Sequence, residues 1–141
     1  EMLQNNKIEA TVLPDPFATI ALNNGHHSLI TSKDLGISIT GTIFTQNALE
    51  EKTKEIEILI IGYNEGVKYI KNHALSEWSS ILIEDVGIPE ELINSVLLPA
   101  YEKASLPKEK DIIQTIKWLK HRNLIPNDYQ GDQLIDSTFI K

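Results

Sequence analysis

The spacing of apolar residues changes about a third of the way along the chain. Before residue 46, short apolar or β-branched runs are separated by turn-forming residues, a pattern typical of strands. We expect strands over 8–13, 27–31 and 38–45, with a loop over 32–36 between the last two. From residue 47 onward apolar residues recur every three or four positions, which predicts helices.

The helical part carries the stronger signal. The segment 53–72 places its apolar residues on one predicted stripe, and 108–122 has isoleucines and a leucine on one side with lysines on the other. Tyr63 and Trp78 lie at core positions of this periodicity, whereas Trp118 lies beside the stripe of its helix. The expected helices are the end of one over 1–6, then 16–24, 53–72, 76–86 ending at Gly87, a short one from Pro89, 108–122, and a last turn over 132–136 capped by Asp132. We therefore predict an α/β fold with three to four strands, about five helices and a helix-rich C-terminal two thirds.

A Pro-Asp-Pro turn joins the first predicted strand to the first predicted helix. Asp15 suits the N-cap, Pro16 suits the first helical position, and Gly25 suits the C-terminal stop. In open α/β sheets, ligands bind beside such strand-to-helix turns. Pro14, Asp15 and Phe17 are therefore candidate ligand-binding residues. Capping by Asp15 with Phe17 packed against the helix explains the same residues, and both interpretations stay open.

A second candidate is Thr40-Gly41-Thr42 in the segment 38–45. Threonine hydroxyls can donate to a polar ligand, and a glycine permits close approach of the backbone, so Gly41 and Thr42 are candidate binding residues. The alternative is an ordinary strand that twists or bulges at Gly41. Thr45, just beyond, carries the same kind of hydroxyl.

Composition excludes several classes of function. The 141 residues suffice for one ordinary domain, and no apolar run reaches the length of a membrane span. A net charge of −7 without a basic stripe disfavours nucleic-acid and anionic-lipid partners. The absence of cysteine excludes thiol catalysis and cysteine-based zinc sites. His26 and His27 lack a third ligand at suitable spacing, so we expect no metal and no cofactor.

Known catalytic motifs are missing from the sequence, including nucleophile elbows, metalloprotease motifs and phosphate-binding glycine loops. The neighbouring carboxylates Glu50-Glu51 and Glu90-Glu91 have the character of solvated helix starts. We therefore expect that the chain is not an enzyme.

An ordered set of short motifs resembles the second half of the substrate-binding proteins of ABC importers. The similar branch captures sulfonates, nitrate, taurine and pyrimidine precursors of thiamine. The motifs run over essentially the whole chain: Leu3-Gln4-Asn5-Asn6-Lys7-Ile8-Glu9-Ala10, Leu13-Pro14-Asp15-Pro16-Phe17-Ala18, Asp34-Leu35-Gly36, Gly41-Thr42-Ile43-Phe44, Tyr63, Glu65-Gly66-Val67-Lys68-Tyr69-Ile70, Ile116-Lys117-Trp118-Leu119, Asn123-Leu124-Ile125 and Leu134-Ile135-Asp136-Ser137-Thr138-Phe139-Ile140.

This resemblance implies part of a type II periplasmic-binding-protein fold with two lobes. By similarity, 1–37 is the end of the second lobe, 38–45 is a strand crossing between lobes, and 46–141 is the helical return to the first lobe. The implied function is to capture a small polar or anionic molecule between the lobes and deliver it to a membrane permease. Pro14-Asp15 stands where many members have Glu or a Trp-Asp pair, so the resemblance does not identify the ligand.

The resemblance also implies a compartment and partners. It places the protein outside the cytoplasm, in the periplasm or as a cell-surface lipoprotein. The first residues carry no signal-peptide pattern, so we expect any export signal to precede Glu1. Amphipathic helices without their sheet would expose apolar faces, and we expect association with a missing N-terminal half or with a second copy by exchange of elements. The alternatives are a ligand-sensing or interaction domain of the same fold, and an enzyme related to thiamine-pyrimidine synthesis.

Overall fold

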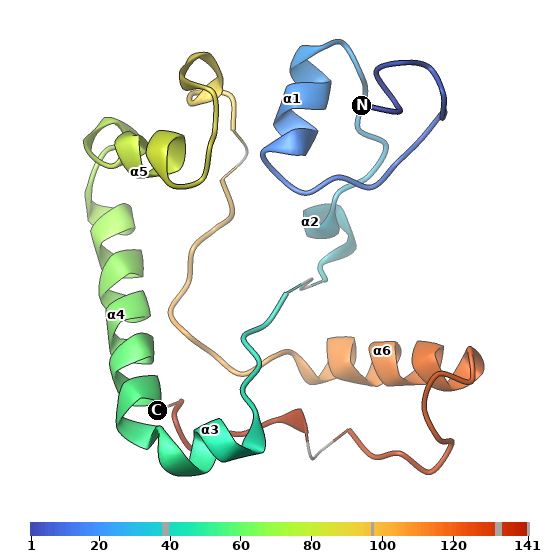
Figure 1. The fold of residues 1–141 in the computed structure, drawn as a ribbon, viewed down its shortest axis with the longest axis vertical. Coiled ribbons are helices and arrows are strands. Elements are labelled where there is room, and N and C mark those ends of the chain that lie inside the picture. Colours follow the sequence, from blue (N-terminus) through green and yellow to red (C-terminus); the bar gives the residue numbers. More distant parts are fainter. Residues whose placement is uncertain (38–39, 97, 132–133, 141) are drawn as a thin grey trace. The chain divides into compact units, whose positions relative to one another are not determined.

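The computed structural model describes residues 1–37, 40–96, 98–131 and 134–140. Its regular elements are all helical, and Figure 1 shows them in chain order. Within these residues they are α1 (Phe17–Asn23), α2 (Ser32–Leu35), α3 (Gln46–Glu51), α4 (Thr53–Asn72), the 3-10 helix η1 (Leu75–Glu77), α5 (Ser79–Glu84), the 3-10 helix η2 (Glu90–Leu92) and α6 (Glu109–His121).

The predicted α/β fold is wrong, because the described residues form no strand or sheet. The segments 8–13, 27–31 and 40–45 run without a hydrogen-bonded ladder, and residues 38–39 lie outside the described residues. β-branched runs fit a pleated surface, but a strand forms only where a second strand supplies the ladder hydrogen bonds. These segments have the composition of strands but pair with no other segment among the described residues.

Most of the predicted helices are confirmed. α4 spans the predicted 53–72, and α1 and α6 each begin and end within one residue of the predicted 16–24 and 108–122. The predicted 76–86 is divided into η1 and α5 at Trp78, whose φ of −136° lies outside the helical range. Gly25 and Gly87 end their segments with φ of +86° and +78°. The predicted cap Asp132 lies outside the described residues.

The chain divides into two compact units, and each unit combines two separate segments. Unit 1 comprises Glu1–Leu29 and Tyr69–Tyr101, and unit 2 comprises Ile30–Lys68 and the residues from Glu102 onward. The chain therefore passes from one unit to the other three times. This division neither tests nor replaces the lobe boundaries inferred from the resemblance.

Unit 1 has an apolar core centred on Trp78. The core joins α5, the turn after it and η2 through four buried side chains, and Ile20 of α1 and Ile70 of α4 pack against its edge. The buried members are Trp78, Leu82, Ile88 and Leu92. The predicted core position of Trp78 is confirmed.

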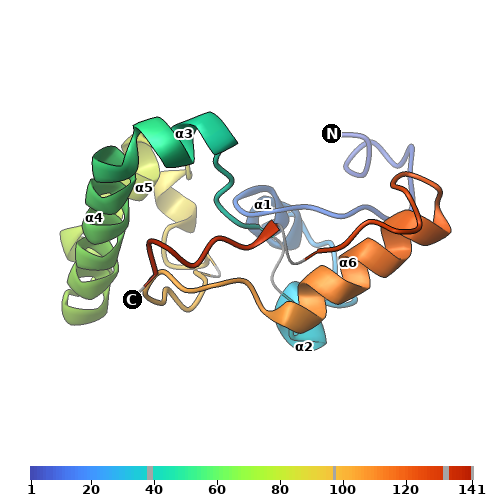
Figure 2. The same cartoon turned by 90° about the horizontal axis from the view of Figure 1, so that it is seen from below.

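Unit 2 is built on α6 and on most of α4. The inner side of α4 buries Ile56 and Val67, which are eleven residues and therefore three helical turns apart. The C-terminal segment runs back along α6 (Figure 2), and a Cβ added at Gly131 would collide with the Ile116 side chain. Glycine at position 131 thus allows the backbone to lie against the apolar side of α6.

Candidate functional site

The strand-to-helix turn predicted as a binding site is a tightly bonded helix start. The backbone N–H of Ala18 donates to the Pro14 carbonyl, and that of Ile20 donates to the Pro16 carbonyl, both at 3.0 Å. The Asp15–Pro16 peptide bond is cis, and α1 begins at Phe17. The prediction of a helix that starts at this turn is confirmed, one residue later than the sequence indicated.

Asp15 caps the first turn through Thr19. Its Oδ1 accepts from the Thr19 backbone N–H at 3.2 Å and from the Thr19 hydroxyl at 2.7 Å. Thr19 is buried, whereas Asp15 itself is exposed. Two donors therefore fix the carboxylate in one orientation. The other oxygen, Oδ2, makes no hydrogen bond within the described part of the chain.

Phe17 and Pro14 flank this carboxylate. Phe17 is more than half exposed, and Pro14 is exposed as well. The predicted packing of Phe17 against its helix is thus incomplete, and its ring is free to contact a ligand. The turn therefore exposes a carboxylate held by two hydrogen bonds together with an aromatic and a proline side chain that are near it in the sequence. Such a surface can accept hydrogen bonds from an amino or amide N–H while the rings cover an apolar edge.

The turn offers little to an anion. The first-turn N–H groups of Ala18 and Thr19 are already bonded to Pro14 and Asp15, so they cannot cradle an anion. The charge of Asp15 would also repel one. The chemistry of these residues favours a neutral or cationic N–H donor.

Gly41 and Thr42 lie in unit 2, whereas Pro14, Asp15 and Phe17 lie in unit 1. Gly41 and Thr42 are both exposed, and a Cβ at Gly41 would meet nothing within 4 Å. Close approach by surrounding atoms therefore does not require glycine there. Thr45, which was considered with them, caps α3 by accepting from the Ala48 N–H at 3.2 Å.

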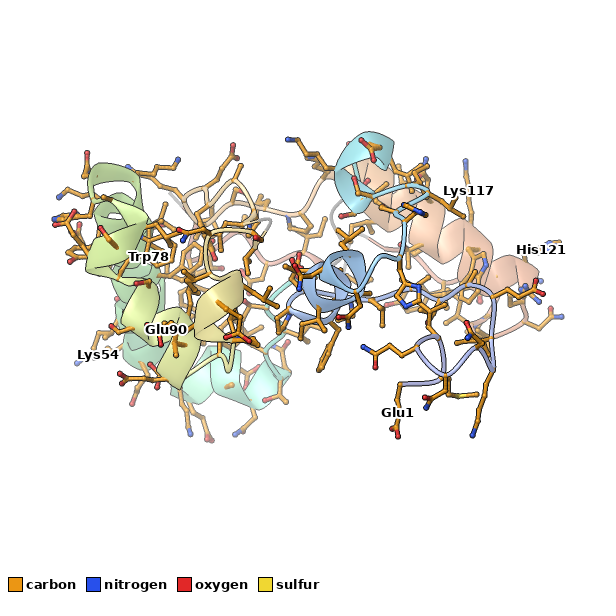
Figure 3. The ribbon with its side chains drawn as sticks, turned by 90° about the horizontal axis from the view of Figure 1, so that it is seen from above. Glu1, Lys54, Trp78, Glu90, Lys117 and His121 are labelled. Atoms are coloured by element: carbon orange, nitrogen blue, oxygen red, sulfur yellow. The ribbon has the colours of Figure 1, made fainter. Side chains whose placement is uncertain are left out.

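Other candidate chemistry is confined to helix ends. Within the described residues no group of histidine or acidic side chains could hold a metal ion. His73 follows α4, stacks on Tyr69 with ring centroids 3.8 Å apart, and its Nδ1 lies 2.7 Å from the Tyr69 carbonyl oxygen. His121 ends α6, and both it and Lys117 extend outward from that helix in Figure 3. Both histidines suit the negative end of a helix dipole.

The sequence analysis missed Thr19. An aspartate followed four residues later by threonine, at the first turn of a predicted helix, was the available signal.

None of the helices in the described residues combines the length and apolar character needed to cross a membrane. No family model matches the chain, and no match was found among curated proteins or solved structures.

Proposed function

We propose that this chain is the C-terminal part of the solute-binding component of an ABC importer, acting outside the cytoplasm and passing its ligand to a membrane permease. It binds a small polar molecule and makes or breaks no bond. Two features support the proposal. One is the ordered set of motifs that resembles this family, and the other is the apolar surface that the chain leaves uncovered.

The exposed apolar surface is the observation that carries the proposal. Val12, Leu29 and Ile43 are 94%, 91% and 91% exposed. Each lies in a segment that has the composition of a buried element. Covering one such side chain stabilises a protein by about 1.5–3 kcal/mol, so three of them are a large fraction of an ordinary stability of about 5–15 kcal/mol. These segments therefore call for another part of the protein, or a partner, to cover them.

The turn around Asp15 suggests which solutes fit. The oriented carboxylate accepts from N–H donors, and the exposed Phe17 ring covers a flat apolar edge. Among the ligand types of the similar branch, an aminopyrimidine has both features. A sulfonate or nitrate would bring its negative charge toward Asp15. We propose an amino-substituted heterocycle as the solute.

Calorimetry on the complete protein that contains this chain tests the proposal. We expect an aminopyrimidine to bind, and a sulfonate and nitrate to bind more weakly or not at all. The isolated chain should bind weakly, because part of the site lies outside it. Asp15→Asn should weaken binding by about tenfold or more, since a charge-assisted hydrogen bond is lost. Asp128→Asn, at an exposed position in unit 2, is the matched control. Failure of the complete protein to bind any of these solutes would contradict the proposal.

A further inference from the structure

The outer face of α4 carries a second apolar surface, separate from the segments discussed above. Ile58 and Ile61 are 68% and 62% exposed, although both lie in the middle of a 20-residue helix. Ile56 and Val67, on the inner side, are buried. Isolated exposed isoleucines are ordinary. Ile58 and Ile61, however, are three residues apart on the same face of one helix and therefore form a continuous apolar strip.

The strip is bounded by opposite charges at its two ends. Lys54, Ile58, Ile61 and Glu65 follow one another at offsets of four, seven and eleven residues, which places them on one line along the helix. Lys54 extends outward from the helix in Figure 3, and the Glu65 side chain is 67% exposed. The four residues span about 16 Å at 1.5 Å per residue.

This line is self-complementary when a second copy lies antiparallel to it. In the register that pairs Ile58 with Ile61 of the other copy, Lys54 of each chain faces Glu65 of the other. Two-fold symmetry then makes every contact twice. The helix dipoles also run in opposite directions in this arrangement, which is favourable. A parallel arrangement would instead place Lys54 against Lys54 and Glu65 against Glu65.

We infer that two copies of this chain associate through the outer faces of α4, antiparallel, with Ile58 against Ile61 and Lys54 against Glu65. Two helix faces of this length bury much less accessible surface than the roughly 1,000 Å² of a stable interface. The dimer is therefore weak and forms with increasing protein concentration. This inference does not depend on the proposed solute-binding function.

Charge reversal tests both the contact and its register. In sedimentation equilibrium, the mass should rise from 15.9 kDa toward twice that value as concentration increases. Lys54→Glu or Glu65→Lys alone should weaken the dimer by about tenfold, because each change replaces two attractive pairs by repulsive ones. The double variant Lys54→Glu/Glu65→Lys should restore the association. Lys71→Glu, elsewhere on the same helix, is the control and should leave the association unchanged.

The restoration separates this contact from local effects. Glu65 also pairs with Lys68 at 3.4 Å within its own helix, and the double variant does not restore that pair. Recovery of the dimer would therefore report the contact between chains. The chain has no cysteine, so mixing an Ile58→Cys chain with an Ile61→Cys chain gives an independent test by disulfide formation. A mass that stays at 15.9 kDa, an unrestored double variant, or no disulfide between the mixed chains would overturn the inference.

Discussion

Unit 1 and unit 2 are each stabilised internally, but by different kinds of interaction. Unit 1 encloses Trp78, Leu82, Ile88 and Leu92 in one apolar cluster. Its long-range contacts are made by apolar side chains that become buried on folding. Their contribution to the free energy of unfolding increases with the apolar area that they bury. The apolar surface of this cluster is therefore already internal to unit 1.

Unit 2 relies more on single hydrogen bonds across long sequence separations. The Tyr63 hydroxyl donates to the Glu102 carbonyl at 3.0 Å, and Asn64 Oδ1 accepts from the Ala104 N–H at 2.8 Å. Lys110 Nζ donates to the Gly36 carbonyl at 3.0 Å. Each such bond contributes about 0.5–1.5 kcal/mol net. Two isoleucines of α4 in unit 2 stay exposed, as do Val12 and Leu29 in unit 1.

Truncating the centre of unit 1 should have the largest effect on stability. Trp78 is 6% exposed, and Trp78→Ala should lower the free energy of unfolding by about 3–5 kcal/mol. Trp118→Ala is the matched control, because Trp118 is exposed. Its main interaction is the cation–π contact with Arg122, whose guanidinium lies 5.7 Å from the centre of its ring. That change should cost about 1 kcal/mol or less. Urea unfolding followed by far-UV circular dichroism measures both.

The same position separates packing from hydrogen bonding. Trp78 Nε1 is buried and has no hydrogen-bond partner among the described residues. Trp78→Phe should therefore cost clearly less than Trp78→Ala, because it removes part of the volume and an unsatisfied donor. Equal losses for Trp78→Ala and Trp118→Ala would show that unit 1 is not organised around this cluster.

Removing one of the long-range hydrogen bonds of unit 2 should lower the free energy of unfolding by less, and the change should be confined to one segment. Asn64→Ala leaves the Ala104 N–H without its acceptor and should cost about 1–2 kcal/mol. Hydrogen exchange of the Ala104 amide should accelerate, while the Trp78 cluster should be unaffected. Asn47→Ala, which removes only an exposed bond of 2.9 Å to Glu51, is the control. An unchanged exchange rate of the Ala104 amide in Asn64→Ala would contradict a stabilising role of the hydrogen bond between Asn64 and Ala104.

The sequence predicted helices well because their signal is local. α4 alternates apolar and polar residues with the helical period over all of 53–72, and each turn satisfies its own backbone hydrogen bonds. Strands cannot satisfy theirs locally, so the same kind of reasoning failed for 8–13 and 27–31. Val12 and Leu29 are residue types that favour strands, but no described segment pairs with theirs.

Some errors were avoidable. The predicted loop 32–36 contains α2, whose start and end are both marked in the sequence. Thr31 and Asp34 form a reciprocal capping box, and Gly36 ends the helix with φ of +62°. At the candidate site, the sequence predicted Asp15 as the N-cap and Pro16 as the first helical residue. Both positions are wrong by one residue, because Pro16 is the N-cap and α1 begins at Phe17, although Asp15 still accepts hydrogen bonds from the first turn. Thr19 donates both hydrogen bonds, and a test for side-chain pairs four residues apart would have found it.

The capping box of α2 gives the smallest of the predicted effects, in unit 2 and at an exposed position. The Thr31 hydroxyl and backbone N–H donate to Asp34 Oδ2 at 2.6 and 2.9 Å, and they hold the pKa of Asp34 below its ordinary value of 3.8. The lowered pKa means that the folded state favours the carboxylate. The contribution is therefore complete above pH 3.8 and disappears as the pH falls through the lower, folded-state pKa.

Thr31→Ala should raise the pKa of Asp34 toward 3.8, because it removes the hydroxyl, the stronger of its two donors, and leaves the backbone N–H. Carboxyl-carbon NMR titration measures the change residue by residue. Asp136 is an internal reference, because the side chain and backbone of Thr138 lower its pKa in the same way and Thr31 does not contact it. An Asp34 pKa that does not move while Asp136 also stays constant would show that α2 begins without this capping box, and that unit 2 lacks one of its local constraints.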